Sequence, residues 1–242
     1  MIISQIEFKG IKALVRKDTL DEWIVKEVIG GTYKKLNIKS TDVALDIGLN
    51  IGMFVCYELN RGADHVFAFE PEKQNFDIAR HNTQMNKYSE KSTLRNLAVV
   101  GNNDKKRDLS VNLKANKGLH SLINKRGRDA IAVKCENINS ILNECKPDII
   151  KIDCEGGEYE ILKSIKSFRG IREMIIEFHH WHLNDSETHE KYKEITDLLK
   201  QHFDDVIYKD NPKHTTGASL IYCKKDDIRI NAENLLETER HE

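Results

Sequence analysis

The feature that most constrains this chain is the alternation of short apolar runs with longer amphipathic segments. The runs DVALDIG, HVFAFE, DIIKID and REMIIEFH have the length and apolar content of buried strands, and stretches with helical spacing separate them. Strands that alternate with helices usually pair in parallel, with helices on both faces of the sheet. We therefore expect an α/β fold with a doubly wound, mostly parallel sheet.

Length and composition set limits on the class of protein. The chain has 242 residues, of which 39% are hydrophobic and 32% charged, which suits one large domain. The formal net charge of −1 gives no overall basic field, so nucleic acid is not a favoured partner. No apolar run approaches the roughly 18 residues that span a bilayer, and the N-terminus lacks the pattern of a signal peptide. Five cysteines without a C-x-x-C pair indicate a reducing compartment, so we expect a cytoplasmic protein.

Three parts are expected along the chain. Residues 1–40 would be a strand and helix extension packed on the core, residues 41–225 the main domain, and residues 226–242 a charged tail. In the extension, IEFKGIKALVR predicts a strand or hairpin.

A helix is predicted over residues 20–33. Thr19 and Glu22 match a capping box at its start, and Trp23 and Val25 would begin its buried stripe.

Later stretches predict further elements. EKQNFDIARHNTQMN, INSILNEC, EYEILKSIKSF and HEKYKEITDLLKQHF have helical spacing, and STLRNLAVV predicts a third strand. DDVIYKD and SLIYCKK predict an antiparallel pair that closes the fold. The polar stretch 101–129 predicts a strand pair with a mobile tip.

Acids and glycines stand at the ends of the first two strands. Asp46 ends the first strand, and Gly48 and Gly52 allow a tight turn that approaches a ligand. Glu70 ends the second strand, where an acid is placed to accept both hydroxyls of a ribose. A carboxylate at the turn would repel a phosphate and attract an ammonium, and the G-x-G-x-x-G pattern is absent. These features favour S-adenosylmethionine (SAM) over NAD, with ordinary loop geometry as the alternative.

At this point the chain resembles the FkbM-like methyltransferases, which are class I SAM-dependent enzymes. The resemblance rests on LDIGLNIGMF, VFAFEPEKQNFDIARHNTQMN, LRNLAV and PDIIKIDCEGGEYEIL, in that order, over roughly residues 21–177. The pattern K-I-D-x-E-G-x-E in the last stretch is the most specific. Leu49 stands where the family usually has a small residue, and we expect it to alter packing near the cofactor without removing the site.

The resemblance implies a seven-stranded, Rossmann-like sheet whose final strand is antiparallel. It also implies methyl transfer, usually to a hydroxyl of a sugar, a polyketide or another small natural product. Glu70 would hold the ribose of SAM, and Asn96 would neighbour the adenine. By position, the methionine end of SAM would be lined by Asp46, Gly48, Asn50 and Gly52.

The stretch KIDCEGGE after the fourth strand supplies the candidate catalytic residues. Lys151 and Asp153 are two positions apart and share one side of the strand, so they could bind a hydroxyl and take its proton. We expect Asp153 to be the general base, with Lys151 or Glu155 orienting the acceptor. The alternative is a structural ion pair. Glu158 is expected to cap the next helix.

The fifth strand ends in EFHHWH, which places Glu177 and His179 on one side. His179 is a candidate second base, because an ordinary imidazole pKa near 6.5 suits proton transfer at neutral pH. Asp153, Glu177 and His179 could also hold a divalent metal that lowers the pKa of the acceptor hydroxyl. We favour the simpler interpretation, a polar strand end without metal.

The basic segment 105–128 could attract an anionic acceptor such as a nucleotide sugar, with His120 and Ser121 in a lid, although such runs are more often solvated hairpins. We expect a small hydroxylated acceptor and no membrane, and a homo-oligomer stays open. Three other functions also stay open: an RNA 2′-O-methyltransferase, a nicotinamide-dependent oxidoreductase and a non-catalytic cofactor-binding protein.

Overall fold

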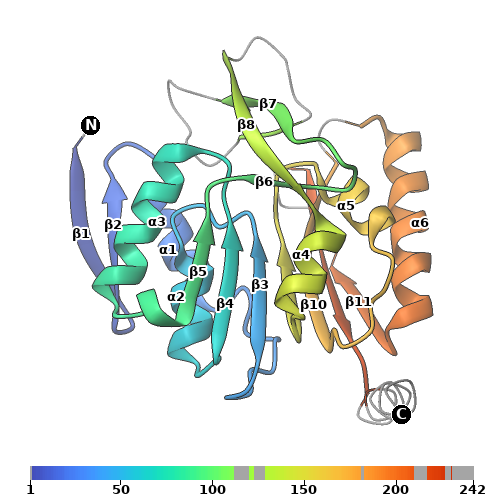
Figure 1. The fold of residues 1–242 in the computed structure, drawn as a ribbon, viewed down its shortest axis with the longest axis horizontal. Coiled ribbons are helices and arrows are strands. Elements are labelled where there is room, and N and C mark those ends of the chain that lie inside the picture. The colour runs from blue at the N-terminus through green and yellow to red at the C-terminus, as the bar shows by residue number, and fades with distance from the viewer. Residues whose placement is uncertain are drawn as a thin grey trace.

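A seven-stranded sheet forms the centre of the protein (Figure 1). The computed structural model describes residues 2–111, 120–122, 129–180, 183–209, 217–226 and 230. The order of the strands is β11-β12-β10-β9-β3-β4-β5, and only β12 runs antiparallel to its neighbours. The strands are β3 Val43–Ile47, β4 His65–Phe69, β5 Ser92–Arg95, β9 Ile149–Ile152, β10 Glu173–His179, β11 Asp205–Lys209 and β12 Ala218–Lys224. The expected fold class and the antiparallel final strand are confirmed.

Helices cover both faces of this sheet, as expected for a doubly wound fold. Side chains alternate along a strand, so Ala44 packs in one hydrophobic cluster with the first three helices, and Leu45 packs in another with the last three. The helices are α1 Asp21–Gly30, α2 Met53–Asn60, α3 Lys73–Met85, α4 Ile138–Cys145, α5 Glu158–Ser164 and α6 Asp185–His202.

The same alternation brings polar residues of three strands to one face. Asp46 of β3 lies opposite Lys151 of β9, and Lys151 lies opposite Ile175 of β10. Two and four positions beyond Ile175, Glu177 and His179 therefore point to the same side. This is the face that α1 and α2 cover, so it collects charged groups near the carboxyl ends of its strands.

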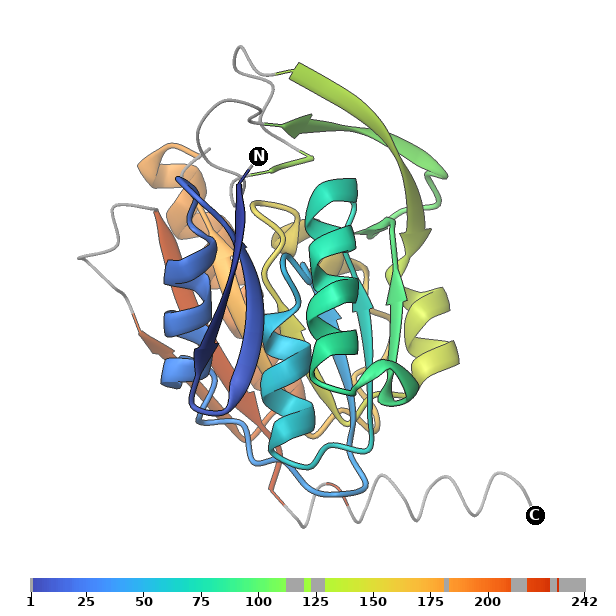
Figure 2. The same ribbon diagram turned by 90° about the vertical axis from the view of Figure 1, so that its left-hand side faces the viewer.

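The N-terminal extension is a hairpin followed by a helix. Strands β1 Ile3–Phe8 and β2 Ile11–Arg16 pair antiparallel, and Figure 2 shows the hairpin lying across α2, between α1 and α3. Buried residues of the hairpin share one hydrophobic cluster with the sheet. The expected hairpin and helix are confirmed, while the division into residues 1–40, 41–225 and 226–242 stays a prediction. Most of the predicted tail lies outside the described residues.

Two details predicted for α1 are wrong. The N-cap residue is Leu20, one position after the predicted Thr19, and its side chain makes no capping hydrogen bond. The Thr19 hydroxyl accepts from the Asp21 N–H at 3.2 Å, but Glu22 pairs with Lys26, so no capping box forms. Trp23 is 51% exposed, whereas Val25 is fully buried. The helix therefore turns Trp23 away from the core.

The prediction of one continuous third strand is also wrong, because the chain turns at Asn96 and forms two separate strands. Its side-chain amide donates to the carbonyl oxygens of Glu70 and Pro71, at 2.8 and 3.0 Å. The chain then leaves the main sheet for a smaller one of order β6-β8-β7, which lies over the carboxyl ends of the parallel strands (Figures 1 and 2). Its strands are β6 Ala98–Val100, β7 Lys106–Val111 and β8 Asp129–Asn137.

Most of the remaining predicted elements are confirmed. The polar stretch 101–129 contains β7, but the partner strand β8 only begins at residue 129, and most of the expected tip lies outside the described residues. The late helices and the antiparallel pair β11 and β12 are present. A short helical turn, Ser89–Lys91, precedes β5. Within the described ranges, no helix is both long and apolar enough to cross a membrane.

Candidate active site

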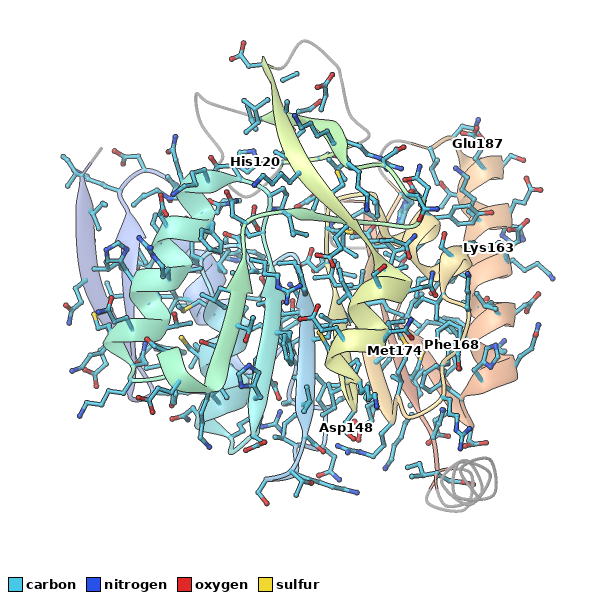
Figure 3. All side chains as sticks on the ribbon, in the orientation of Figure 1. His120, Asp148, Lys163, Phe168, Met174 and Glu187 are labelled. Atoms are coloured by element: carbon cyan, nitrogen blue, oxygen red, sulfur yellow. The ribbon has the colours of Figure 1, made fainter. Side chains whose placement is uncertain are left out.

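Two cavities lie at the carboxyl ends of the parallel strands and share Gly48, Asn50, Asp153 and Glu155. Figure 3 shows His120, which lines the first cavity, at this end of the sheet, and Asp148 at the opposite end. The first cavity contains about 620 Å³ of space and the second about 790 Å³, open solvent included.

The predicted SAM contacts divide into two groups. Gly48, Asn50 and Glu70 line the first cavity. Asp46, Gly52 and Asn96 line neither cavity.

Gly48 is required by a close approach inside the protein. Its φ is +94°, and a Cβ atom there would lie 1.7 Å from the carbonyl oxygen of Asp153. Its N–H donates to the carbonyl of Phe69 at 3.1 Å. The glycine therefore lets the turn after β3 pack against both neighbouring strand ends, which fixes the wall shared by the two cavities.

Asp46 lies beneath this turn, fully buried, and faces Lys151. The Lys151 Nζ atom is 3.0 Å from Asp46 Oδ1, 3.4 Å from Asp153 Oδ2 and 2.6 Å from the carbonyl oxygen of Gly48. Burial raises the pKa of Asp46, and Lys151 partly offsets this effect. Burial alone would lower the pKa of Lys151, but the fields of Asp46 and Asp153 outweigh it and raise that pKa. Asp46 thus keeps a buried lysine charged and does not form the cavity wall.

Glu70 lies directly after β4 and is 5% exposed. Its two oxygens accept hydrogen bonds from the backbone N–H groups of Asn50 and Glu72, both at 2.9 Å. Burial raises the pKa of Glu70 to about 7, although these hydrogen bonds act in the opposite direction. The acid therefore ties the turn after β3 to the start of α3 while it faces the cavity.

The small sheet supplies an apolar wall that the sequence did not indicate. Ala98, Val99 and Leu109 line the first cavity together with Ile47 and Phe69 of the main sheet. No sequence signal marks these three as site residues, because their position depends on the chain leaving the main sheet at Asn96.

The segment 120–122 also reaches the first cavity. His120 and Leu122 line it, and the Ser121 hydroxyl donates to the carbonyl oxygen of Glu155 at 2.6 Å. This placement fits the predicted lid, although most of the basic residues of segment 105–128 lie outside the described residues. Arg107 is described and is paired with Asp104 and Glu160.

The second cavity is acidic. Glu27 of α1 and Glu177 of β10 line it in addition to Asp153 and Glu155. Burial raises the pKa of Glu27 to about 7 and that of Glu177 to about 8, and the charge of Asp153 adds to both shifts. Sequence reasoning missed Glu27, because nothing in the pattern of α1 distinguishes it from a surface acid.

His179 lies against Glu158 at the edge of the second cavity. Its Nδ1 atom is 3.0 Å from Glu158 Oε1, and its Nε2 atom is 3.5 Å from Glu155 Oε2 and 3.9 Å from Glu177 Oε1. Burial alone would lower the pKa of His179, but the surrounding carboxylates, Glu158 first, outweigh it and raise that pKa well above the ordinary value. The ring is therefore protonated at neutral pH, which disfavours the expected role as a second base.

Glu158 has a different partner from the one predicted. It lies in the first turn of α5, whose N-cap Gly157 makes no side-chain hydrogen bond. Its buried carboxylate instead accepts from the backbone N–H groups of Cys154 and Gly156, at 2.9 and 3.0 Å, as well as from His179. Glu158 thus orders the loop that carries Glu155.

The positions of three side chains show whether a divalent metal could bind beside the second cavity. Asp153, Glu155 and His179 offer ligand atoms within 4.8 Å of one another, whereas the predicted set used Glu177 in place of Glu155. A metal would need the neutral imidazole, and the carboxylates that would attract a metal also hold a proton on the ring. A metal and this proton would compete for the same place, and a metal site stays the less favoured alternative.

Fold and site together are those of a Rossmann-like methyltransferase. A family model described as "Methyltransferase FkbM domain" matches residues 46–206, which is more than half of the chain. The chain therefore belongs to the FkbM methyltransferase family, and the resemblance based on its motifs is confirmed. Among curated proteins, none matches this sequence.

Solved structures share the fold at low sequence identity. A putative transferase from Pyrococcus horikoshii is 16% identical, with a TM-score of 0.52 over 92% of this chain and 72% of that one. TYW2 from P. horikoshii, in complex with MeSAdo, is 14% identical, with a TM-score of 0.49 over 91% of this chain and 69% of that one. TYW2 from M. jannaschii, in complex with AdoMet, is 10% identical, with a TM-score of 0.47 over 92% and 84%. The first of these supports the Rossmann-like fold.

Proposed function

We propose that this methyltransferase takes its methyl group from SAM and transfers it to a hydroxyl of a small molecule, such as a sugar, a glycan precursor or another natural product. The observation that carries the proposal is that the two cavities meet at Gly48, Asn50, Asp153 and Glu155. Methyl transfer is an in-line displacement, so donor and acceptor must approach from opposite sides. Two cavities that share one wall provide such an arrangement.

The first cavity suits the adenosine part of the donor. Its apolar wall from both sheets fits a flat purine, and Glu70 lies where two ribose hydroxyls could donate to one carboxylate. Because its oxygens already accept backbone N–H groups, Glu70 is held in place before any ligand arrives. Asn50 and Gly48 continue this wall to the place where the two cavities join, and the methionine part would lie there.

Asp153 has the position that a general base needs. It lines both cavities, its side chain is 27% exposed, and Lys151 holds it at 3.4 Å. When bound, SAM supplies a methyl carbon made electrophilic by the sulfonium. Asp153 would take the proton of the acceptor hydroxyl as that oxygen attacks. Glu155, held through Ser121 and beside His179, would orient the acceptor.

The alternatives have less support. A phosphodiester would meet four carboxylates in the second cavity, which disfavours RNA 2′-O-methylation. The family match favours methyl transfer over nicotinamide chemistry. All five cysteines are free thiols, in keeping with the proposed cytoplasmic location.

The experiment is calorimetric titration of the protein with SAM, S-adenosylhomocysteine and NAD, repeated on Glu70→Ala and on the exposed control Glu90→Ala. We expect SAM and S-adenosylhomocysteine to bind, Glu70→Ala to weaken both, and the control to leave them unchanged. A screen of sugars and nucleotide sugars for methyl acceptance follows, with Asp153→Asn as the negative control. Absence of SAM binding, or a preference for NAD, would overturn the proposal.

A further inference from the structure

The second cavity holds more carboxyl groups than its own cations can pair. It is lined by four carboxylates, those of Glu27, Asp153, Glu155 and Glu177, and by only two basic groups, Lys151 and His179. Both basic groups are already engaged by buried acids behind the cavity wall, Lys151 by Asp46 and His179 by Glu158.

Glu27 and Glu177 are the acids least compensated within the described part of the chain. Glu27 forms no ion pair there, and the one ion pair of Glu177 is with His179, with 3.9 Å between Nε2 and Oε1. Lys34 and Lys35 line an adjoining surface cavity with both acids, but neither lysine forms an ion pair with them. The two carboxylates are half-buried, so water screens them less than it screens surface acids.

Tyr33 gives a second, independent indication. Its side chain is 4% exposed and lines the second cavity, and within the described part of the chain its hydroxyl makes no hydrogen bond. The hydroxyl lies in the field of Asp153, Glu177 and Glu27. A tyrosine whose ring is buried usually has a partner for its hydroxyl. This hydroxyl is not sealed from solvent but opens on the cavity, where it is available to a ligand.

The remaining wall suits the carbon skeleton of a small molecule. Trp23, Ile24, Met53 and Phe54 line the cavity from α1 and α2. Trp23, which was predicted to lie in the core, is exposed and lines this cavity.

We propose that the second cavity binds a methyl acceptor that carries a protonated amine besides the hydroxyl to be methylated, and that Glu27, Glu177 and Tyr33 bind this ammonium group. An ammonium has three N–H donors and no acceptor, which matches two carboxylates and one hydroxyl oxygen. This inference rests on the proposed methyltransferase function and names the substrate class of the same site.

The two positive charges of SAM, its sulfonium and its methionine ammonium, do not account for these residues. Asp153 and Glu155 lie where the two cavities join, so they are the acids nearest to a methionine part held there. Glu27 and Glu177 line only the second cavity and the adjoining surface cavity, away from the first. They therefore remain for the acceptor.

The amine would bind the acceptor without itself being methylated. Two carboxylates stabilise the protonated form of an amine, and a protonated amine has no lone pair with which to attack a methyl group. The hydroxyl placed near Asp153 stays the nucleophile, so the product would be an O-methyl compound with a free amine.

The test uses pairs of sugars that differ only in an ammonium or a hydroxyl group. D-Glucosamine against D-glucose and D-galactosamine against D-galactose are titrated into the free protein and the protein loaded with S-adenosylhomocysteine. Glucose 6-phosphate and MgCl₂ are titrated in parallel. We expect each amino sugar to bind about tenfold more tightly than its partner, since a charge-assisted hydrogen bond contributes about that much. Glu27→Gln and Glu177→Gln should each remove most of this difference in affinity. Tyr33→Phe should reduce the difference from about tenfold to about threefold.

Glu22→Gln is the matched control, because Glu22 lies on the same helix, is exposed and pairs with Lys26. It should leave every affinity unchanged, and all variants should keep their affinity for S-adenosylhomocysteine. The proposal is overturned if the members of each pair bind equally or not at all, or if the phosphate sugar binds best. The proposal is also overturned if magnesium binds, if Glu177→Gln removes that binding, and if amino sugars are not preferred. That result would assign the carboxylates to a metal. If Glu27→Gln or Glu177→Gln loses affinity for S-adenosylhomocysteine, these acids bind the ammonium of the cofactor, and the proposal is overturned. If the unmutated protein does not bind S-adenosylhomocysteine, the proposed function is refuted instead, and the amine preference is still measured on the free protein.

Discussion

Glu70 and Glu177, a buried and a half-buried acid on opposite sides of the point where the cavities join, have very different surroundings at the same end of the sheet. Burial raises the pKa of Glu70 to about 7 and that of Glu177 to about 8. Glu70 accepts two backbone N–H groups at 2.9 Å, whereas Glu177 faces other carboxylates, and its one ion pair among the described residues is with His179, at 3.9 Å. The backbone thus preorganises the proposed cofactor side, and the proposed acceptor side keeps an acid without a close partner until a ligand binds.

The largest effect should come from the wall that both sides share. Gly48→Ala would place a Cβ atom 1.7 Å from the carbonyl oxygen of Asp153, so the turn or the end of β9 must move. We expect loss of detectable SAM binding and a fall of about 3 kcal/mol in the free energy of unfolding, measured by calorimetry and urea denaturation. Gly62→Ala is the control, because Gly62 also has a positive φ, +104°, but open space around it. Equal effects at both glycines would mean that backbone strain, and not the shared wall, is responsible.

Next in size is a change that separates chemistry from binding. Asp153→Asn keeps the shape of the shared wall but removes the proposed base. We expect methyl transfer to fall by about 10² to 10³-fold while the SAM dissociation constant changes by less than about threefold. The rate is measured as S-adenosylhomocysteine released with the acceptor found by the sugar screen. A variant with nearly normal turnover would exclude Asp153 as the base.

A smaller effect is expected on the cofactor side alone. Glu70→Gln should weaken SAM binding by about tenfold, because a charged acceptor for the ribose hydroxyls is lost. In the unmutated protein, SAM affinity should rise as pH passes upward through about 7, where the Glu70 carboxyl loses its proton. Titrations at several pH values test this, and a pH dependence that persists unchanged in Glu70→Gln would assign it to another group.

The smallest effect belongs to the acceptor side and concerns stability. The pKa of Glu177 is higher in the folded protein than its ordinary 4.5, so the fold binds a proton that the unfolded chain has released. The contribution of this carboxyl group to the free energy of unfolding therefore decreases as pH rises from about 4.5 to about 8. Glu177→Gln should stabilise the ligand-free protein at about pH 8, by roughly 1 kcal/mol. Thermal unfolding of this variant beside Glu22→Gln tests the sign, and a Glu177→Gln variant that is less stable would show that the carboxylate is already satisfied.

The comparison also shows what could be predicted from sequence. Glu70 was predictable, because an acid directly after a buried strand needs only the local strand pattern to be placed at the ligand edge. The pairing of Lys151 with Asp153 was predictable for the same reason, since two positions on one strand share a side. Glu27 and Tyr33 were not predictable, because α1 meets the end of β10 only through contacts between segments 150 residues apart.

The sequence by itself determined the doubly wound sheet, its antiparallel closing pair and the acids at the strand ends, since strand and helix periodicity are local properties of the chain. Only the tertiary structure decided three further points. It turned the third strand aside at Asn96 to build an apolar wall, it placed Asp46 under Lys151 and out of the cavity, and it surrounded His179 with carboxylates that keep its ring protonated. Each depends on burial and on charges brought together from distant segments, and no local pattern encodes those distances.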